Sequence, residues 1–150
     1  MRTSSTPAGV GDPAAHLDEH ECWALLRTAD VGRLALVIEG RPEIFPVNFV
    51  VDHGTVLFRT ATGSKLAAVT PSSAPVAFEA DSYDPVKGEA WSVIAKGRAS
   101  EVTGIHEVFD LAELPLFPWH IAPKPHFVRI EPEELTGRRF RVSPPRAWPR

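Results

Sequence analysis

The sequence predicts a mainly β domain of the α+β class, in which antiparallel strands close into a barrel beside a few short helices. Strand-like segments follow one another through short turns such as Gly40-Arg41-Pro42 and His53-Gly54. Helical patterns are few and short, and the sequence has no internal repeat. A doubly wound parallel sheet needs a helix after nearly every strand, so the pattern favours an antiparallel barrel.

The first expected element is an amphipathic helix over Leu17–Leu26. Asp18 is followed three residues later by Glu21, which is the spacing of a capping box. In such a box each side chain accepts a hydrogen bond from the other residue's backbone N–H. The apolar residues of this helix are expected to face the core.

Three antiparallel strands are expected next, at Arg33–Glu39, Ile44–Asp52 and Val56–Thr60. Pro46 interrupts the second of them, and proline has no N–H to donate to a strand ladder. We therefore expect an edge, a bulge or an opening of the sheet at Pro46.

The second half of the chain alternates short helices with further strands. Gly97 is expected to bend the longest strand. In order, the sequence predicts a helix over Ser64–Val69, a strand over Pro75–Ala80, a loop over Asp81–Glu89, a strand over Ala90–Thr103, a helix over Ile105–Leu114, an irregular segment over Pro115–Pro125 and a closing strand over His126–Ile130.

Length and composition favour one folded domain over residues 17–140, between flexible tails at 1–16 and 141–150. The formal net charge of −3 argues against nucleic acid as a partner. No apolar run has the length of a signal peptide core or a membrane span, so we expect a cytoplasmic protein without membrane contact. Cys22 is the single cysteine, and no Cys/His spacing predicts a metal site.

A candidate phosphate site lies between the third expected strand and the following helix. Arg59 and Thr60 end the strand, and Ser64 and Lys65 begin the helix after Gly63. Two cations, hydroxyl groups and free backbone N–H groups suit the binding of an anion. The alternative is a strand with an exposed arginine, a turn and an ordinary capped helix.

A second candidate site is Pro46-Val47-Asn48-Phe49, where a proline and an asparagine stand among apolar residues. Backbone groups left free there would match the polar edge of a flat heterocycle such as a flavin. Alternatively, Pro46 protects an edge strand and Asn48 caps a bulge.

Tryptophans offer further candidate contacts. Trp91 and Ser92 begin the long strand, and Trp119 lies in a proline-rich connection. Either indole can stack on a planar ligand, fill a subunit interface or pack in the core.

The remaining polar clusters favour ordinary explanations. Glu79, Asp81 and Asp84 are expected to be solvated, since no second cluster completes a metal coordination sphere. Arg138-Arg139 would suit an anionic substrate, but exposed arginines need no ligand. The six histidines lack metal-ligand spacing, and no nucleophile elbow or dinucleotide fingerprint is present.

Together these segments resemble the pyridoxamine 5'-phosphate oxidase-like superfamily of FMN-binding split barrels, especially its small actinobacterial members. The order of the motifs carries the resemblance, which reaches Thr136-Gly137-Arg138-Arg139. The motifs are Gly32-Arg33-Leu34-Ala35, Pro42-Glu43-Ile44-Phe45-Pro46-Val47-Asn48-Phe49, Phe58-Arg59-Thr60, Gly63-Ser64-Lys65-Leu66, Val76-Ala77-Phe78-Glu79-Ala80-Asp81, Gly88-Glu89-Ala90-Trp91-Ser92-Val93 and Lys96-Gly97-Arg98-Ala99.

The resemblance implies a six-stranded antiparallel split β-barrel that forms a homodimer, with one FMN in each of two clefts at the subunit interface. It assigns the FMN phosphate to Arg59, Thr60, Ser64 and Lys65, and the isoalloxazine ring to the strand Pro46, Val47, Asn48 and Phe49. It also implies that Trp91 and Ser92 approach the pyrimidine side, and that Trp119 reaches across from the partner subunit.

The expected function is that of an FMN-dependent oxidoreductase acting on a small-molecule substrate, with no catalytic residue assigned. Oxidases of vitamin B6 carry a basic C-terminal segment that grips the substrate phosphate, and this chain has the proline-rich Ser143–Arg150 in its place. Two alternatives keep the same fold. One is a reductase that uses the deazaflavin coenzyme F-420, and the other is a non-enzymatic module that binds flavin or haem.

Overall fold

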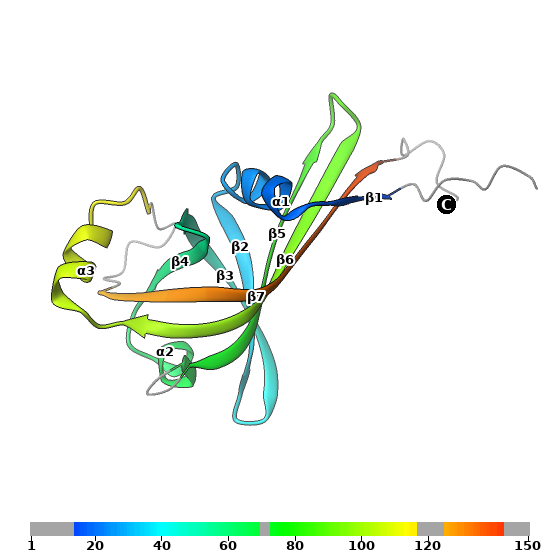
Figure 1. Cartoon of the computed structure of the whole chain (residues 1–150). Coiled ribbons are helices and arrows are strands. Elements are labelled where there is room, and N and C mark those ends of the chain that lie inside the picture. Colours follow the sequence, from blue (N-terminus) through cyan, green and yellow to red (C-terminus); the bar gives the residue numbers. More distant parts are fainter. Residues whose placement is uncertain (1–13, 70–72, 117–124, 143–150) are drawn as a thin grey trace, which may run out of the picture.

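The computed structural model describes residues 14–69, 73–116 and 125–142 of the chain. It has seven strands and three short helices in this part (Figure 1). In chain order the elements are β1 (Ala14–Leu17), α1 (Glu19–Leu26), β2 (Val31–Ile38), β3 (Arg41–Asp52), β4 (Thr55–Thr60), α2 (Ser64–Val69), β5 (Ala74–Asp84), β6 (Glu89–Val102), α3 (Ile105–Leu111) and β7 (His126–Arg141).

Six of the strands close into an antiparallel barrel, as the sequence predicts. The order around the ring is β7, β4, β3, β2, β5 and β6, and β6 pairs again with β7 to close it. The expected count of six strands is corrected to seven, because β1 pairs with the far end of β7, from Ala14 opposite Phe140 to Leu17 opposite Gly137. Strand β1 therefore lies on the N-terminal side of Leu17, the residue at which the folded domain was expected to begin.

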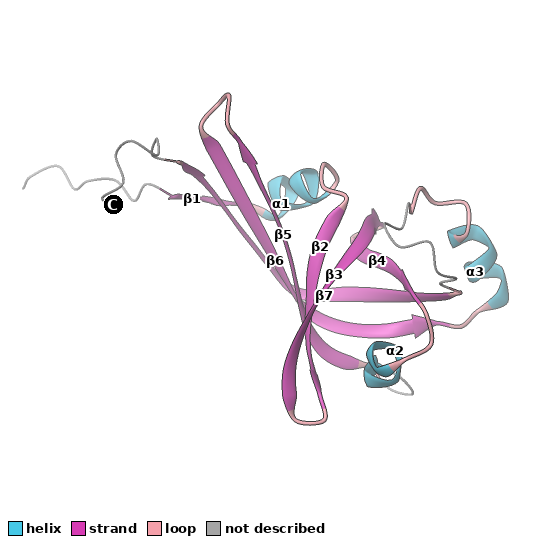
Figure 2. Cartoon of the chain, turned by 180° about the vertical axis from the view of Figure 1, so that it is seen from behind, coloured by secondary structure: helices cyan, strands magenta, loops and turns pink. Residues whose placement is uncertain are grey.

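Strands β5, β6 and β7 continue well beyond the barrel as a long arm, which is prominent in Figure 2. The prediction of a loop over Asp81–Glu89 is wrong for most of these residues, because β5 runs to Asp84 and the turn contains only Pro85–Gly88. The closing strand, expected to end at Ile130, likewise continues to Arg141. Polar residues are tolerated in these extensions because the strands leave the core there and expose their side chains.

Helix α1 begins at the predicted capping box. Glu21 N–H donates to the Asp18 carboxylate at 2.8 Å, and Asp18 N–H donates to the Glu21 carboxylate at 3.0 Å. The helix buries Cys22 and Leu26 and packs against β7 and β6. Burial is the main cause that raises the pKa of the Cys22 thiol, and the nearby carboxylates raise it further. The thiol therefore stays protonated and packs as a small apolar core group.

Two apolar clusters lie on opposite faces of the barrel wall. Inside the barrel, Phe49 and Phe78 meet edge to face with ring centroids 4.8 Å apart, within a core that includes Leu34, Phe58 and Ile130. Outside it, a smaller cluster of Leu57, Val102, Leu111, Leu116 and Phe127 lies under α3. Helix α3 ends at Leu111 rather than at the expected Leu114.

Gly97 marks a β-bulge in β6, in agreement with the predicted bend. The register between β6 and β7 shifts between Lys96 and Gly97. A Cβ atom at Gly97 would collide with the backbone carbonyl of Glu131 and approach Pro132 Cα at 2.8 Å. The two backbones therefore approach closely here because position 97 has no side chain.

Arg129 of β7 ties α3 to the β3–β4 hairpin. Its guanidinium donates to the Asp52 carboxylate at 2.9 Å, to the Thr55 hydroxyl at 2.6 Å and to the Glu107 carboxylate at 3.2 Å. Burial by itself raises the pKa of Asp52, but the hydrogen bonds from Arg129 and His53 outweigh it, and the pKa lies below its ordinary value. The charged form of Asp52 therefore stabilises the fold.

We predict that Gly97→Ala lowers the free energy of unfolding by about 1–3 kcal/mol, because the methyl group forces β6 and β7 apart. Urea unfolding of the purified protein measures this. Gly63→Ala is the control, because no atom lies within 4 Å of a Cβ there. Equal stability of the two variants would contradict the close approach at Gly97.

We predict that Asp52→Asn lowers the free energy of unfolding at pH 7 by about 1.5–3 kcal/mol, as expected for a hydrogen bond to a charged group. A lowered carboxyl pKa stabilises the fold above the unfolded-state value of about 4 and ceases to do so as pH falls through the folded-state value. The gap between wild type and variant should therefore shrink toward pH 3. A gap that stays constant in urea unfolding from pH 7 to pH 3 would contradict this assignment.

Candidate functional site

The barrel wall opens between β3 and β4. Along β3, residues Arg41–Asn48 pair with β2, whereas the described pairing with β4 is limited to Phe49–Asp52 opposite Thr55–Phe58. Pro46 lies in the part of β3 that has left β4, opposite Arg33 of β2. Of the three alternatives expected at Pro46, an edge, a bulge or an opening, the structure shows an opening, and this part of β3 faces the segment that follows β4.

Helix α2 brings the candidate phosphate residues beside this edge. The helix begins at Ser64, as predicted, and Lys65 Nζ lies 5.0 Å from the centroid of the Phe45 ring on β3. Thr60, the last residue of β4, is 4% exposed, whereas Ser64 is an exposed residue. Two regions identified separately in the sequence therefore lie next to each other.

Arg59 takes a different direction from Thr60. Adjacent residues of a strand project to opposite faces, and Arg59 is partly buried with its guanidinium carbon 4.9 Å from the centroid of the Phe127 ring. Phe127 belongs to the apolar cluster under α3. Arg59 thus approaches the end of β4 from the α3 side, whereas Lys65 approaches from the β3 side.

The candidate ring-binding strand offers mainly its backbone. Val47 and Phe49 are buried in the core, and Pro46 is exposed. The Asn48 side-chain amide donates to the Asp30 carbonyl at 3.5 Å, and the Phe49 N–H donates to the same carbonyl at 3.2 Å. This attachment to the connection between α1 and β2 fixes the position at which β3 turns away from β4.

Trp91 and Ser92 lie on the arm, far from α2 within one chain. Trp91 pairs with Ser82 and Arg139 at the outer part of β6. The site end of β6 is Val102, which pairs with Phe127, the neighbour of Arg59. The eleven residue steps from Trp91 to Val102 correspond to roughly 35 Å of strand at about 3.3 Å per residue. Trp119 lies outside the described residues.

Ser92 lines a hollow of about 430 Å³ where β1, β6 and β7 meet. Its other lining residues include His16, Thr136 and Arg138. Arg138 lies directly opposite Ser92 in the ladder, so a cation and two hydroxyl groups face this hollow.

The carboxylates of β5 are more structured than the sequence predicts. Arg33 of β2 donates to Glu79 at 3.3 Å and to Asp81 at 3.0 Å, so these two acids are not simply solvated. Burial and the neighbouring Asp81 raise the pKa of Glu79 despite the opposing effect of Arg33. Asp84 accepts hydrogen bonds from the backbone of the arm's turn. Among the described residues, no cluster of His, Cys, Asp or Glu is placed to hold a metal ion.

One group of polar residues was missed in the sequence. His126 Nδ1 lies 2.6 Å from the Glu101 carboxylate, and His126 Nε2 lies 3.1 Å from the Thr62 hydroxyl, on the loop before α2. These three residues are widely separated along the chain, so no local spacing pattern predicts their contact.

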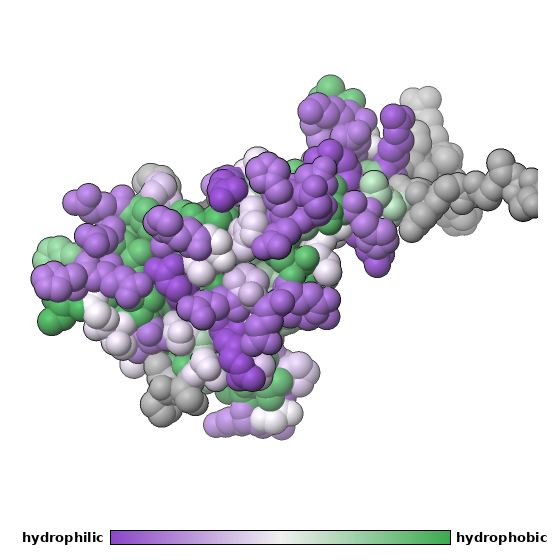
Figure 3. All heavy atoms as spheres, viewed as in Figure 1, coloured by the Kyte–Doolittle hydropathy of each residue, from purple (hydrophilic) through white to green (hydrophobic). Residues whose placement is uncertain are grey.

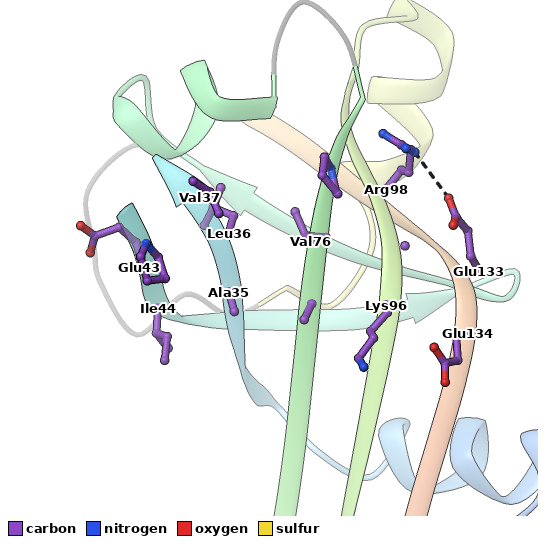
Figure 4. A pocket seen from close by; sticks show the side chains of 14 residues that line it. Ala35, Leu36, Val37, Glu43, Ile44, Val76, Lys96, Arg98, Glu133 and Glu134 are labelled. Atoms are coloured by element: carbon purple, nitrogen blue, oxygen red, sulfur yellow. Dashed lines mark ion pairs between the residues drawn. The ribbon is translucent and has the colours of Figure 1, made fainter. Parts of the chain in front are cut away.

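An apolar groove of about 780 Å³ crosses the outer face of the barrel (Figure 4). Val37 and Ile44 line it and are 63% and 69% exposed. Charged residues of both signs lie at its β6–β7 side, where Arg98 pairs with Glu133 at 3.4 Å. In the part of the chain that is described, no helix is long and apolar enough to cross a membrane.

Comparisons with known proteins agree with this architecture. A Mycobacterium tuberculosis protein, named Uncharacterized protein Rv0080, is 39% identical over 128 residues, which is 83% of this chain and 84% of that protein. The FAD binding protein from Mycobacterium smegmatis has a TM-score of 0.70 and 40% identity, over 85% of this chain and 98% of that chain. A conserved protein of unknown function from Corynebacterium diphtheriae has a TM-score of 0.71 and 39% identity, over 86% and 99% of the two chains.

The match to a family model is equally extensive. The model described as pyridoxamine 5'-phosphate oxidase matches residues 18–139, which span the barrel from the cap of α1 to the outer part of β7. The fold expected from the resemblance, a split barrel, is confirmed by these neighbours. The chain therefore belongs to the pyridoxamine 5'-phosphate oxidase family.

Proposed function

We propose that this chain binds a flavin in the opening between β3 and β4, and that this flavin is FMN. The observation that carries the proposal is the contact of Lys65 with Phe45, because it places a cation and the start of α2 beside the part of β3 that lies beyond its described pairing with β4. The 40% identical FAD binding protein from Mycobacterium smegmatis supports a flavin as the ligand class.

The donor set fits a flavin phosphate. Lys65 and Arg59 supply positive charge from two sides of the β4 end, and Thr60 and Ser64 supply hydroxyl groups. Charge-assisted hydrogen bonds to phosphate oxygens are the strongest polar contacts that such side chains make. We assign the phosphate to these four residues.

The ring would lie against the β3 edge, where backbone groups of Pro46, Val47, Asn48 and Phe49 contact its polar side. Bound flavin supplies hydride and electron transfer chemistry, and the protein binds, orients and shields it. We infer an oxidoreductase of a small-molecule substrate that works in the cytoplasm. The deazaflavin coenzyme, and binding without turnover, are the competing assignments.

We propose that the chain acts as a homodimer with a cofactor at each subunit interface. Trp91 and Ser92 are separated from Arg59 by roughly 35 Å of strand. One flavin can therefore contact this pair and the phosphate residues only when the two sets belong to different subunits. Trp119 is proposed to reach the site from the partner as well. The groove beside Val37 and Ile44 offers the apolar surface for the contact, and Figure 3 shows apolar side chains at the β2–β3 hairpin.

We predict that the purified protein binds FMN and retains its visible absorption bands after gel filtration. Parallel titrations with FMN, FAD, riboflavin and the deazaflavin coenzyme rank the ligands. Tighter binding of FMN than of riboflavin is expected because riboflavin lacks the phosphate. A protein that binds none of the flavins would refute the proposed function. Tighter binding of the deazaflavin coenzyme than of FMN would change the assigned cofactor to the deazaflavin.

We predict that Lys65→Ala weakens FMN binding by about 1–3 kcal/mol, because it removes a charge-assisted hydrogen bond to the phosphate. Arg59→Ala should act in the same direction. Quenching of flavin fluorescence measures both dissociation constants. Lys87→Ala, in the turn of the arm, is the matched control for the loss of one positive charge. Unchanged FMN affinity in both site variants would place the phosphate elsewhere.

We predict that Ile44→Glu converts a dimer into a monomer, because it introduces a charge into the exposed apolar groove. Light scattering after gel filtration should give twice the chain mass for wild type and the single chain mass for the variant. Since Ile44 is largely exposed in one chain, the variant should unfold with normal cooperativity. A wild-type protein that is already monomeric would refute the proposed assembly.

A further inference from the structure

Three polar side chains, joined by hydrogen bonds, connect the loop between β4 and α2 to strands β6 and β7. Glu101 accepts a hydrogen bond from His126 Nδ1 at 2.6 Å, and His126 Nε2 contacts the Thr62 hydroxyl at 3.1 Å. The His126 and Glu101 side chains are only 29% and 21% exposed. Thr62 lies on the loop itself, between Thr60 and Ser64, which are both proposed phosphate contacts. One imidazole thus connects this loop to a carboxylate fixed on the barrel.

The register of the strands explains why these groups meet. His126 is the first residue of β7 and lies opposite Thr60, the last residue of β4. Glu101, near the end of β6, lies opposite Val128. Residues two apart on a strand share a face, so Glu101 and His126 lie on the same side of the sheet. The β4–β7 and β6–β7 pairings therefore bring the backbone positions of these residues together.

The hydrogen bonds define how protons are arranged in the two charge states of His126. A carboxylate can only accept, so Nδ1 carries a proton in both states. In the neutral imidazole Nε2 then accepts a hydrogen bond from the Thr62 hydroxyl. In the imidazolium Nε2 donates to the Thr62 oxygen, and the hydroxyl proton becomes available to another acceptor. Protonation thus adds one positive charge and releases one donor at the loop.

The Glu101 carboxylate contacts this imidazole, and two cations lie on neighbouring elements. Glu101 approaches from β6, and Lys65 lies on α2, which follows the Thr62 loop. Arg59 lies on the opposite face of β4, over Phe127.

We propose that His126, held by Glu101, is a positioning residue of the phosphate loop, and that its protonation strengthens flavin phosphate binding through Thr62. This rests on the flavin site proposed above and adds to it a dependence on pH. Free phosphate monoesters lose their second proton near pH 6, which favours binding as pH rises. Protonation of His126 has the opposite effect, because it favours binding as pH falls. The phosphate and His126 contributions are therefore separated by comparing the pH dependence of wild type with that of variants.

The test measures dissociation constants of FMN and riboflavin at pH 6 and pH 8 by fluorescence quenching. The variants are His126→Gln, which cannot titrate, and the control His53→Asn. His53 also contacts a carboxylate, Asp52 at 2.9 Å, but lies at the opposite end of β4. Its positive φ of 48° is one that asparagine tolerates. We expect the ratio of the FMN dissociation constants, pH 8 over pH 6, to be about fivefold larger in wild type than in His126→Gln, as a partly exposed charge–charge contact implies.

Riboflavin should give the same pH ratio in wild type and in His126→Gln, and His53→Asn should behave as wild type with FMN. Thr62→Val provides a second test on an exposed loop residue, where folding is not at risk. It should weaken FMN binding more at pH 6 than at pH 8. An FMN pH ratio that is the same in wild type and His126→Gln, or an equal loss in Thr62→Val at both pH values, overturns the role of His126 and leaves the flavin site intact. Absence of flavin binding by wild type at both pH values overturns both proposals.

Discussion

The divergence of β3 from β4 is the constraint on which the site depends. A closed barrel satisfies its backbone groups through neighbouring strands, so an opening in the wall leaves polar groups that need another partner. Here β3 keeps its pairing with β2 while it leaves β4 beyond Phe49. Hydrogen bonds to the Asp30 carbonyl fix the point of divergence. The opening is therefore a built feature of the fold, and a planar ligand with a polar edge matches its chemistry.

The length of β6 and β7 links the barrel to the arm. Both strands contribute to the inner core, to the cluster under α3 and to the extension beyond the barrel (Figure 1). The bulge at Gly97 allows β6 to bend between these regions without losing its pairing with β7. The arm carries Trp91 and Ser92 away from α2 within one chain. The homodimer proposed above would bring these residues of one subunit to the phosphate residues of the other.

Local features of the sequence predict much of this structure. The capping box, the exact span of α2, the bend at Gly97 and the opening at Pro46 follow from residue chemistry that acts over a few positions. The arm could not be predicted in this way, because Asp81–Tyr83 have the composition of a loop and become a strand through pairing with Ala90–Ser92. The contact of Arg33 with Glu79 and Asp81, and that of Thr62 with His126, join residues far apart in sequence. Such contacts are set by barrel register, which no single segment determines.

Both cations of the proposed phosphate site rest on aromatic rings, Lys65 on Phe45 and Arg59 on Phe127. A cation–π contact at a partly exposed site is worth about 0.5–1 kcal/mol. A hydrogen bond to a charged partner is worth about 1.5–3 kcal/mol, so a phosphate competes successfully for either side chain. The rings hold the long side chains near the end of β4 before a ligand arrives, which reduces the conformational entropy lost on binding. In a chain of net charge −3, this local arrangement of cations, rather than any general positive field, is what can attract an anionic cofactor to this end of the barrel.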